Sequence, residues 1–290
     1  MIELLKKGIF RLYSLKNTVF GSSSFKGVKI LLYHNVDEKY FETHLKYLKS
    51  KYEVISLKDM LSKFLSGDEL SNTFVITFDD GVKENYSLLS IIKKYNIEPT
   101  IFITNHVTTN QRYWFNGLQQ EELIKLLEVP NHERLEIIGN YIEKKNITSR
   151  EALSLHELNE MKDFVDFQPH TVTHPSLVQC SEREIEDEIK SSYEFVKNIT
   201  GEKPVTFAPP FGIYDERVIE VLKKLSFKAS LTVTPGINSN HENLFALKRI
   251  GVPKTCDLNE FITRIDGVWD MIRGLPIFKD YSSFYNQYYE

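Results

Sequence analysis

The sequence is poor in cysteine, in clustered basic residues and in long apolar runs, and each shortage excludes a class of protein. Its two cysteines, Cys180 and Cys256, are too few for a disulfide framework, and neither has the spacing of a metal site. The 36 basic and 40 acidic residues give a net charge of -4 without a basic stripe, so we expect no nucleic-acid partner. The scarcity of cysteine suits a reducing compartment.

The first apolar segment is also too short for export or for crossing a bilayer. Arg11 and Lys16 interrupt it earlier than the core of a signal peptide allows, so we expect a cytoplasmic protein. The apolar residues of this segment recur at helical spacing: Ile2, Leu5, Ile9 and Leu12. Residues 1–16 therefore predict an amphipathic helix that packs on its own domain. The alternative is peripheral contact of these residues with the inner face of the membrane.

What the chain does contain is a regular alternation of apolar strand-like runs with helical patterns. This alternation is typical of a mainly parallel sheet covered by helices, an α/β fold. Residues 105–155 break the rhythm with aromatic and then charged helical segments, and we interpret them as an inserted helical segment. The predicted strands are 27–33, 74–78, 100–104, 164–168, 205–208 and 228–233.

The stretch "TFDDG" ends one of these strands in two adjacent carboxylates, Asp79 and Asp80. A buried strand rarely ends in unpaired negative charge, so these acids are expected to bind something. Because neighbouring side chains of a strand point to opposite faces, both acids can serve one site only where the strand ends. Gly81 allows the chain to turn there. A helix cap would explain one acid but not its neighbour.

Two histidines, His170 and His174, follow another strand in the stretch "HTVTH". Their spacing suits one side of a helical turn, although Pro175 makes a tight loop equally compatible with the sequence. The carboxyl ends of parallel strands share one face of a barrel, which brings these histidines to the two acids. Two neutral imidazoles and one carboxylate leave positions on a metal open for water. The second acid is then free to take a proton.

At these residues the sequence resembles the polysaccharide deacetylase family, the NodB-homology group of carbohydrate esterases. "TFDDG" and "HTVTH" match its first two motifs, and the resemblance covers roughly residues 27–255. It implies a single distorted (β/α) barrel, with residues 1–26 and 256–290 as terminal extensions. It also implies that Asp79 is the general base and that Asp80, His170 and His174 bind a divalent metal. Zinc is the expected metal, with cobalt, nickel or manganese as alternatives.

Two departures from the family pattern point to a subgroup. Ala208 in "APPF" stands where the family usually has arginine, and "FALKRIGV" lacks the usual C-terminal Leu-x-His motif. The poly-N-acetylglucosamine deacetylases also have alanine there and carry a catalytic histidine in an N-terminal "YH" motif, which resembles "LLYHNV" here. His34 is therefore the candidate general acid. Arg249 is a candidate to hold the base or a substrate group.

The resemblance implies hydrolysis of the N-acetyl group of an amino sugar. The expected substrate is a surface polysaccharide or its nucleotide- or lipid-linked precursor, and removal of a formyl group would use the same residues. We expect the backbone N–H of Phe211, beside Pro210, to stabilise the oxyanion. Two rivals are a non-haem iron oxygenase, which the strand and helix pattern disfavours, and a non-catalytic carbohydrate-binding homologue. Four further histidines are interpreted as surface or helix residues: His106, His132, His156 and His241.

Overall fold

A computed structural model describes residues 2–20, 24–105, 113–144 and 150–273 of the chain. Its main sheet has the strand order β5-β4-β3-β1-β8, with the short β2 paired to the start of β3, and every pairing is parallel. A second parallel sheet pairs β6 with β7. The strands are β1 (Val28–Tyr33), β2 (Glu53–Val54), β3 (Thr73–Phe78), β4 (Thr100–Ile103), β5 (Asp166–Pro169), β6 (Thr206–Phe207), β7 (Ala229–Ser230) and β8 (Arg249–Gly251).

Two further links join the two sheets into a distorted (β/α) barrel. A parallel bridge between Leu231 and Leu247 connects the end of β7 to the segment that leads into β8. On the other side, the side-chain oxygen of Gln168 on β5 accepts hydrogen bonds from the backbone N–H groups of Val205 and Thr206, both at 3.0 Å. The predicted α/β barrel is therefore confirmed. The sequence did not reveal β2 and β8, which are only two and three residues long.

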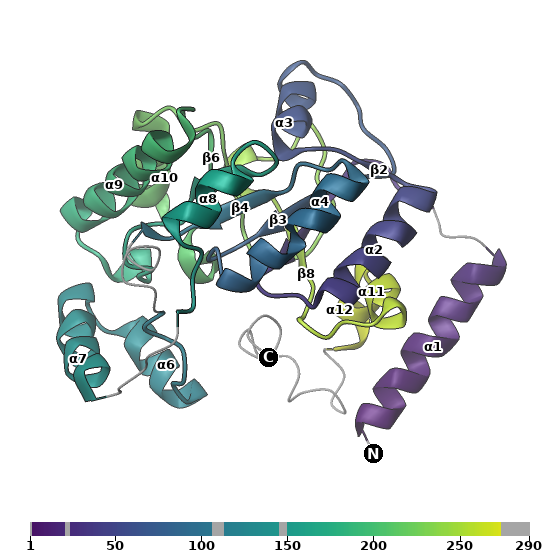
Figure 1. Cartoon of the computed structure of the whole chain (residues 1–290), viewed down its shortest axis with the longest axis horizontal. Helices are drawn as coiled ribbons and strands as arrows, with labels where there is room; N and C mark the ends of the chain where they lie inside the picture. The colour runs from purple at the N-terminus through teal and green to yellow at the C-terminus, as the bar shows by residue number, and fades with distance from the viewer. Residues whose placement is uncertain (1, 21–23, 106–112, 145–149, 274–290) are drawn as a thin grey trace.

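Helices cover the outside of the barrel. In Figure 1, α4 and α8 lie in front of β3 and β4, α2 lies beside α4, and α9 and α10 pack beside one another. The helices are α1 (Ile2–Phe20), α2 (Glu38–Lys51), α3 (Leu57–Leu65), α4 (Leu89–Tyr95), α6 (Gln120–Glu128), α7 (Asn131–Lys144), α8 (Leu155–Met161), α9 (Glu182–Thr200), α10 (Glu216–Lys224), α11 (Leu258–Ile265) and α12 (Val268–Ile272). In the described ranges, no helix combines the length and apolar character needed to cross a lipid bilayer.

The strands show a strict division between the barrel interior and the helix-facing side. On β3, Val75 belongs to the cluster that fills the barrel, whereas Phe74, Ile76 and Phe78 belong to the cluster under the helices. Strand residues alternate between the two faces, so the inward series on β3 continues from Val75 to positions 77 and 79. The same alternation explains why a continuous apolar run is buried on both faces.

The predicted insertion and extensions form parts of this architecture. Helices α6 and α7 lie within residues 105–155, and the end of this segment returns to the barrel where Leu153 donates its N–H to the carbonyl of Gly81 at 2.9 Å. Helices α11 and α12 follow β8, and α11 contacts α1, α2 and β8. Residues 274–290 of the predicted C-terminal extension, and His106 of the insertion, lie outside the described residues.

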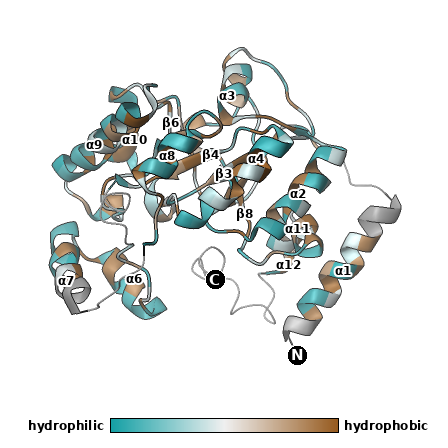
Figure 2. Ribbon diagram, viewed as in Figure 1, coloured by the Kyte–Doolittle hydropathy of each residue, from teal (hydrophilic) through white to brown (hydrophobic). Residues whose placement is uncertain are grey.

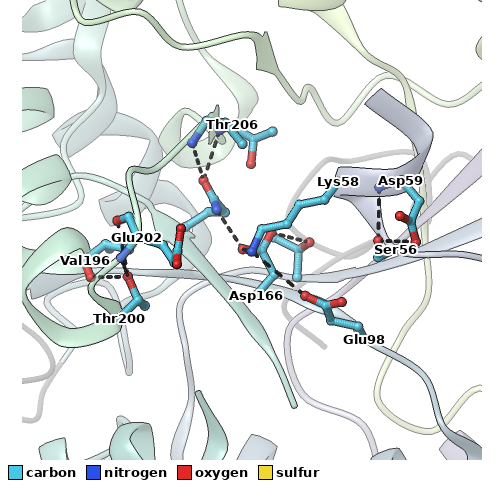
Figure 3. Close-up of polar contacts among 12 residues, drawn as sticks. Ser56, Lys58, Asp59, Glu98, Asp166, Val196, Thr200, Glu202 and Thr206 are labelled. Carbon is cyan, nitrogen blue, oxygen red and sulfur yellow. Dashed lines mark hydrogen bonds and ion pairs between the residues drawn. The ribbon is translucent and has the colours of Figure 1, made fainter. Parts of the chain in front are cut away.

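Polar groups at the amino end of the barrel are paired with one another. Asp166, the first residue of β5, accepts hydrogen bonds from Thr100 at 3.2 Å and from Gln168 at 2.8 Å. Lys58 on α3 lies 3.1 Å from the same carboxylate and 3.9 Å from Glu98. Figure 3 shows Lys58 pointing toward Asp166 and Glu98. The buried carboxylate of Asp166 therefore has partners on both oxygens, all of them from this chain.

Candidate active site

Asp79 points into the barrel because it continues the inward series of β3. Its backbone N–H extends the ladder by donating to the carbonyl of Tyr33 at 2.9 Å. Arg249 on β8 holds the carboxylate with two parallel bonds, Nη1 to Oδ1 at 2.6 Å and Nη2 to Oδ2 at 2.7 Å. Arg249 also donates to the carbonyl of Thr232, and no part of it is exposed. This paired geometry fixes the plane of the carboxylate.

The charge of Asp79 is maintained against burial. Burial alone would raise the pKa of this carboxyl, but the Arg249 guanidinium, together with His170 and His34, outweighs burial and lowers the pKa below its ordinary value. Asp79 is therefore ionised at neutral pH. An ionised carboxylate in the barrel mouth can accept a proton.

Asp80 turns away from the strand direction and into the same site. Its φ of 71° and that of Gly81, 72°, are both left-handed, so the strand ends in a tight turn. A side chain at Gly81 would meet Cγ2 of Ile103 at 2.8 Å, which explains the glycine. Tyr113 secures the turn by donating its hydroxyl to the carbonyl of Asp80 at 2.9 Å. This turn allows the neighbouring side chains of Asp79 and Asp80 to face the same site.

Asp80, His170 and His174 form the group that could hold a metal ion in the described part of the chain. Their ligand atoms lie within 4.8 Å of one another, and all three residues are buried. Oδ1 of Asp80 is 3.4 Å from Nε2 of His170 and 3.2 Å from Nε2 of His174. Yet Oδ1 of Asp80 and both ring nitrogens of His174 make no hydrogen bond of proper geometry. Atoms that converge without bonding one another fit a shared cation.

A backbone carbonyl orients the ring of His170. Its Nδ1 lies 2.6 Å from the carbonyl oxygen of Ala208, just past β6, so this nitrogen carries the proton and Nε2 is left for a ligand. Ala208 is the residue at which the sequence departs from the arginine of the family motif. Its contribution here comes from the backbone, and any residue type could supply it.

The loop between the two histidines is held in a strained conformation. Thr171 and His174 have φ values of 70° and 54°, which non-glycine residues rarely adopt. The carboxylate of Glu188 on α9 accepts the N–H groups of Val172 at 2.7 Å and Thr173 at 2.9 Å, and the Thr173 hydroxyl at 2.6 Å. The tight loop, rather than a helical turn, is the conformation of the "HTVTH" motif.

Aromatic residues of the insertion form a wall behind His174. Trp114 donates its ring N–H to the carbonyl of His174 at 2.9 Å, and Phe115 lies 4.8 Å from the imidazole between ring centres. Phe211, which follows Pro210 in a short 3-10 turn, packs against the same ring at 4.6 Å. Burial lowers the pKa of His174 to about 4, against the opposing effect of Asp80. The ring is therefore neutral at pH 7, as a metal ligand must be.

His34 completes the carboxyl end of the barrel. It follows β1 and is partly exposed, and Asn85 fixes its backbone by donating to its carbonyl at 2.9 Å. Burial lowers the pKa of His34, whereas the nearby Asp80 and Asp79 carboxylates oppose this change. The two acids are therefore near enough to influence the charge of this ring.

The structure thus gathers the candidate residues of the sequence in one place and leaves other histidines outside it. His132, His156 and His241 are exposed. Sequence reasoning missed Tyr113, Trp114, Phe115 and Glu188. The aromatic triplet "YWF" at the start of the insertion was the available signal for three of them, while nothing in the helical pattern of α9 distinguishes Glu188 from its acidic neighbours.

A buried Asp-His-His group that could hold a metal ion, beside an arginine-held carboxylate at the carboxyl end of a (β/α) barrel, is compatible with the class of metal-assisted hydrolases. Comparison with known proteins narrows this class. The model of the family "Polysaccharide deacetylase" matches residues 66–230, so this chain belongs to the polysaccharide deacetylase family. The predicted enzyme class, a carbohydrate N-deacetylase, is thereby confirmed.

Individual relatives are distant in sequence but similar over most of the chain. The protein YxkH of Bacillus subtilis (strain 168) is 24% identical over 77% of this chain and 70% of its own. The poly-beta-1,6-N-acetyl-D-glucosamine N-deacetylase of Staphylococcus aureus (strain MSSA476) is 23% identical over 87% of this chain and 78% of its own. The structure of the Streptococcus pyogenes deacetylase PplD in complex with acetate matches with a TM-score of 0.64 at 21% identity, over 83% of this chain and 99% of that one.

Proposed function

We propose that this protein removes the N-acetyl group from an amino sugar of a surface polysaccharide or of its nucleotide- or lipid-linked precursor. The observation that carries the proposal is the pairing, within one barrel mouth, of a carboxylate clamped by Arg249 with a converging Asp-His-His group. The Staphylococcus aureus relative, named for deacetylation of poly-beta-1,6-N-acetyl-D-glucosamine, supports an N-acetylated amino sugar as substrate.

Asp80, His170 and His174 would hold a divalent metal ion, with zinc as the expected ion. Such an ion supplies Lewis acidity, which lowers the pKa of water and polarises a carbonyl group. The chain prepares the ligands in advance, because Ala208 fixes the proton of His170 on the far nitrogen and burial keeps His174 neutral. Cobalt, nickel and manganese remain alternatives, since nitrogen and oxygen ligands accept each of them.

Asp79 would act as the general base. Its ionised carboxylate would accept the proton that the attacking water loses as its oxygen bonds to the acyl carbon. Arg249 has two effects in this step. It keeps Asp79 charged and aimed, but its bonds to both carboxylate oxygens also lower the basicity of the group. Asp79 is therefore a weak base, but it is ionised and able to accept a proton over a wide pH range.

His34 would act as the general acid, and the backbone N–H of Phe211 would donate to the oxyanion. The leaving nitrogen must gain a proton before the C–N bond breaks, and an imidazolium at His34 would provide it. Burial lowers the pKa of His34, so the imidazolium is the minor form at pH 7. The carboxylates of Asp80 and Asp79 oppose this effect and favour the imidazolium. The products would be acetate and a free amine on the sugar.

The test compares the two neighbouring acids in the purified protein. Release of acetate and of formate is measured from polymeric, lipid-linked and nucleotide-linked N-acylhexosamines. Asp79→Asn should retain its metal and lose roughly 100- to 10,000-fold in rate, since its amide cannot take a proton. Asp80→Asn should lose metal and recover part of its activity when metal is in excess.

Three outcomes would contradict these assignments. Rescue of Asp79→Asn by excess metal, with Asp80→Asn inactive despite bound metal, would reverse the two roles. Release of formate alone would replace deacetylation by deformylation. Binding of N-acetylated sugars without any release of acid would favour a carbohydrate-binding protein and overturn the hydrolase proposal.

A further inference from the structure

Helix α1 presents two different faces, and within the described residues one of them contacts α11 and α12. In Figure 1 it lies at the edge of the molecule, with α11 and α12 on one side. Phe10 packs edge-on against Trp269 at 5.6 Å, and Nζ of Lys6 lies 3.7 Å from Glu260 on α11. Tyr13 donates to Asp266 at 3.4 Å. These contacts fix which side of the helix points outward.

The outward side carries a stripe of leucines. Leu5, Leu12 and Leu15 are 49%, 71% and 53% exposed, although their spacing places them on one face of the helix. Gly8 lies between them, and no atom of the described residues lies within 4 Å of the position its Cβ would take. Figure 2 shows hydrophobic residues recurring along α1 between hydrophilic ones. Single exposed leucines are ordinary on protein surfaces, but an aligned set on a peripheral helix indicates a partner.

Basic residues border this stripe. Lys7 and Arg11 are both exposed and lie one helical turn apart, and the segment from residue 5 to residue 15 contains no acidic residue. The whole protein has a net charge of -4, so this basic border is opposite in sign to the average surface. Apolar residues flanked by Lys and Arg are the composition of helices that lie in the headgroup region of a bilayer.

We propose that α1 is the docking face of this protein for an anionic phospholipid surface. The leucine stripe enters the boundary between headgroups and acyl chains, and Lys7 and Arg11 contact the headgroup phosphates. A second copy of the chain is a poorer occupant, because pairing two stripes brings two basic borders together, and residues 5–15 contain no acidic side chain to balance them. The inner face of α1 stays on α11 and holds the barrel at the lipid surface.

Vesicle binding of the full chain tests this proposal. Co-sedimentation is measured with vesicles of phosphatidylcholine alone and of phosphatidylcholine with phosphatidylglycerol at about 3:1. We expect binding to the anionic vesicles, a loss of roughly fivefold for each of Lys7→Gln and Arg11→Gln, and weaker binding at high salt. Leu12→Glu should weaken binding at least about tenfold, since it places a charge in the apolar stripe.

The matched control is Leu65→Glu on α3. Leu65 is 61% exposed and lies outside α1, so its variant should bind vesicles as the parent does. Circular dichroism melting curves check that each variant is folded. Absence of binding to anionic vesicles, or equal losses from Leu65→Glu and Leu12→Glu, would overturn the proposal. So would a dimer in sedimentation equilibrium that Leu12→Glu converts to a monomer, because the occupant would then be a second copy.

Discussion

Asp166 at the amino end of the barrel and Asp80 at the carboxyl end are both buried carboxylates at the ends of parallel strands. The first has Thr100, Gln168 and Lys58 as partners, all supplied by the chain. The second leaves Oδ1 without a hydrogen bond while two imidazoles converge on it. Burial of charge therefore says little about function by itself. What separates a structural carboxylate from a ligand is whether the fold satisfies it.

The pKa values of these two carboxyl groups move in opposite directions. Burial raises the pKa of Asp166, and the opposing effects of Lys58 and the hydrogen bonds do not overcome it. At Asp80, burial is outweighed by the contacts to His170 and His174, and the pKa is lowered well below its usual range. The carboxyl end thus maintains charge in a buried place, which a site for a cation requires.

The largest expected effect at the carboxyl end comes from removal of a candidate metal ligand, which tests the difference between Asp80 and Asp166. His174→Ala should weaken metal binding by at least about 100-fold, more than changes behind the ligands usually cost, and activity should fall with it. Metal content is measured by elemental analysis after dialysis. Asp166→Asn is the matched control at the other end and should keep its metal and its rate. Full metal occupancy in His174→Ala would remove this histidine from the site.

The next effect concerns the clamp on the base. Arg249→Met leaves Asp79 buried without its partner, which should raise the pKa of Asp79 and cost about 3–5 kcal/mol in free energy of unfolding. The acidic limb of the pH–rate profile should then move to higher pH, so that activity is lost first at low pH. Arg249→Lys, which keeps the charge but loses the paired geometry, should lie between. An unchanged limb in both folded variants would contradict the clamp.

A smaller effect is expected from the support of the histidine loop. Glu188→Ala removes the acceptor of the Val172 and Thr173 N–H groups and should weaken metal affinity by about 10- to 100-fold. Glu188→Gln keeps one acceptor oxygen and should restore most of that affinity. Competition with a chelating dye measures the affinity, and the absorption spectrum of the cobalt form reports ligand geometry. Asp187→Ala, exposed on the same helix, is the control and should change neither.

The smallest expected effect concerns His44, a buried histidine whose hydrogen bonds are satisfied, in contrast to those of His174. His44 is buried like His174, but both its ring nitrogens have partners, Tyr33 Oη at 3.1 Å and the Cys256 carbonyl at 2.9 Å. Burial lowers the pKa of His44 to about 4. Between about pH 6.5 and pH 4 the unfolded chain therefore binds a proton here that the folded chain does not. Stability should fall as pH falls through this window, by at most about 3 kcal/mol from His44.

Urea unfolding at pH 7 and pH 4.5 measures this contribution. His44→Gln cannot titrate, so the difference in unfolding free energy between the two pH values should shrink relative to the parent. The exposed His132→Gln is the control and should leave the difference unchanged. An equally large loss of stability in His44→Gln on acidification would assign the pH dependence to other groups.

Sequence patterns predicted the parts of this molecule that repeat or that carry motifs. The strands that reach four residues were found because their apolar runs are continuous, and the acids and histidines were found because strand ends gather on one face. The short β8 was not predicted, so the sequence did not show that Arg249 faces Asp79. The three residues of β8 do not lie in a longer apolar run, whereas the equally short β6 and β7 lie inside the predicted strands 205–208 and 228–233. Pairing with β1 sets the register of β8 and places Arg249 opposite Ile30.

Other features depend on tertiary contacts that no local pattern encodes. The left-handed backbone of Thr171 and His174 is not encoded by a local pattern, and the loop between them is bound by Glu188 from a different element. The carbonyl of Ala208 is likewise invisible in a sequence, since every residue has one. The motifs located the centre of the site, whereas its supports came from residues whose identity is ordinary.

The join between β5 and β6 closes the barrel through side-chain hydrogen bonds. Elsewhere neighbouring strands of the main sheet are tied by backbone ladders, but here the rotatable side chain of Gln168 binds the N–H groups of Val205 and Thr206. At the other end of the same join, His170 is tied to the carbonyl of Ala208. The hydrogen bond that orients the candidate ligand His170 therefore spans the same join that closes the barrel.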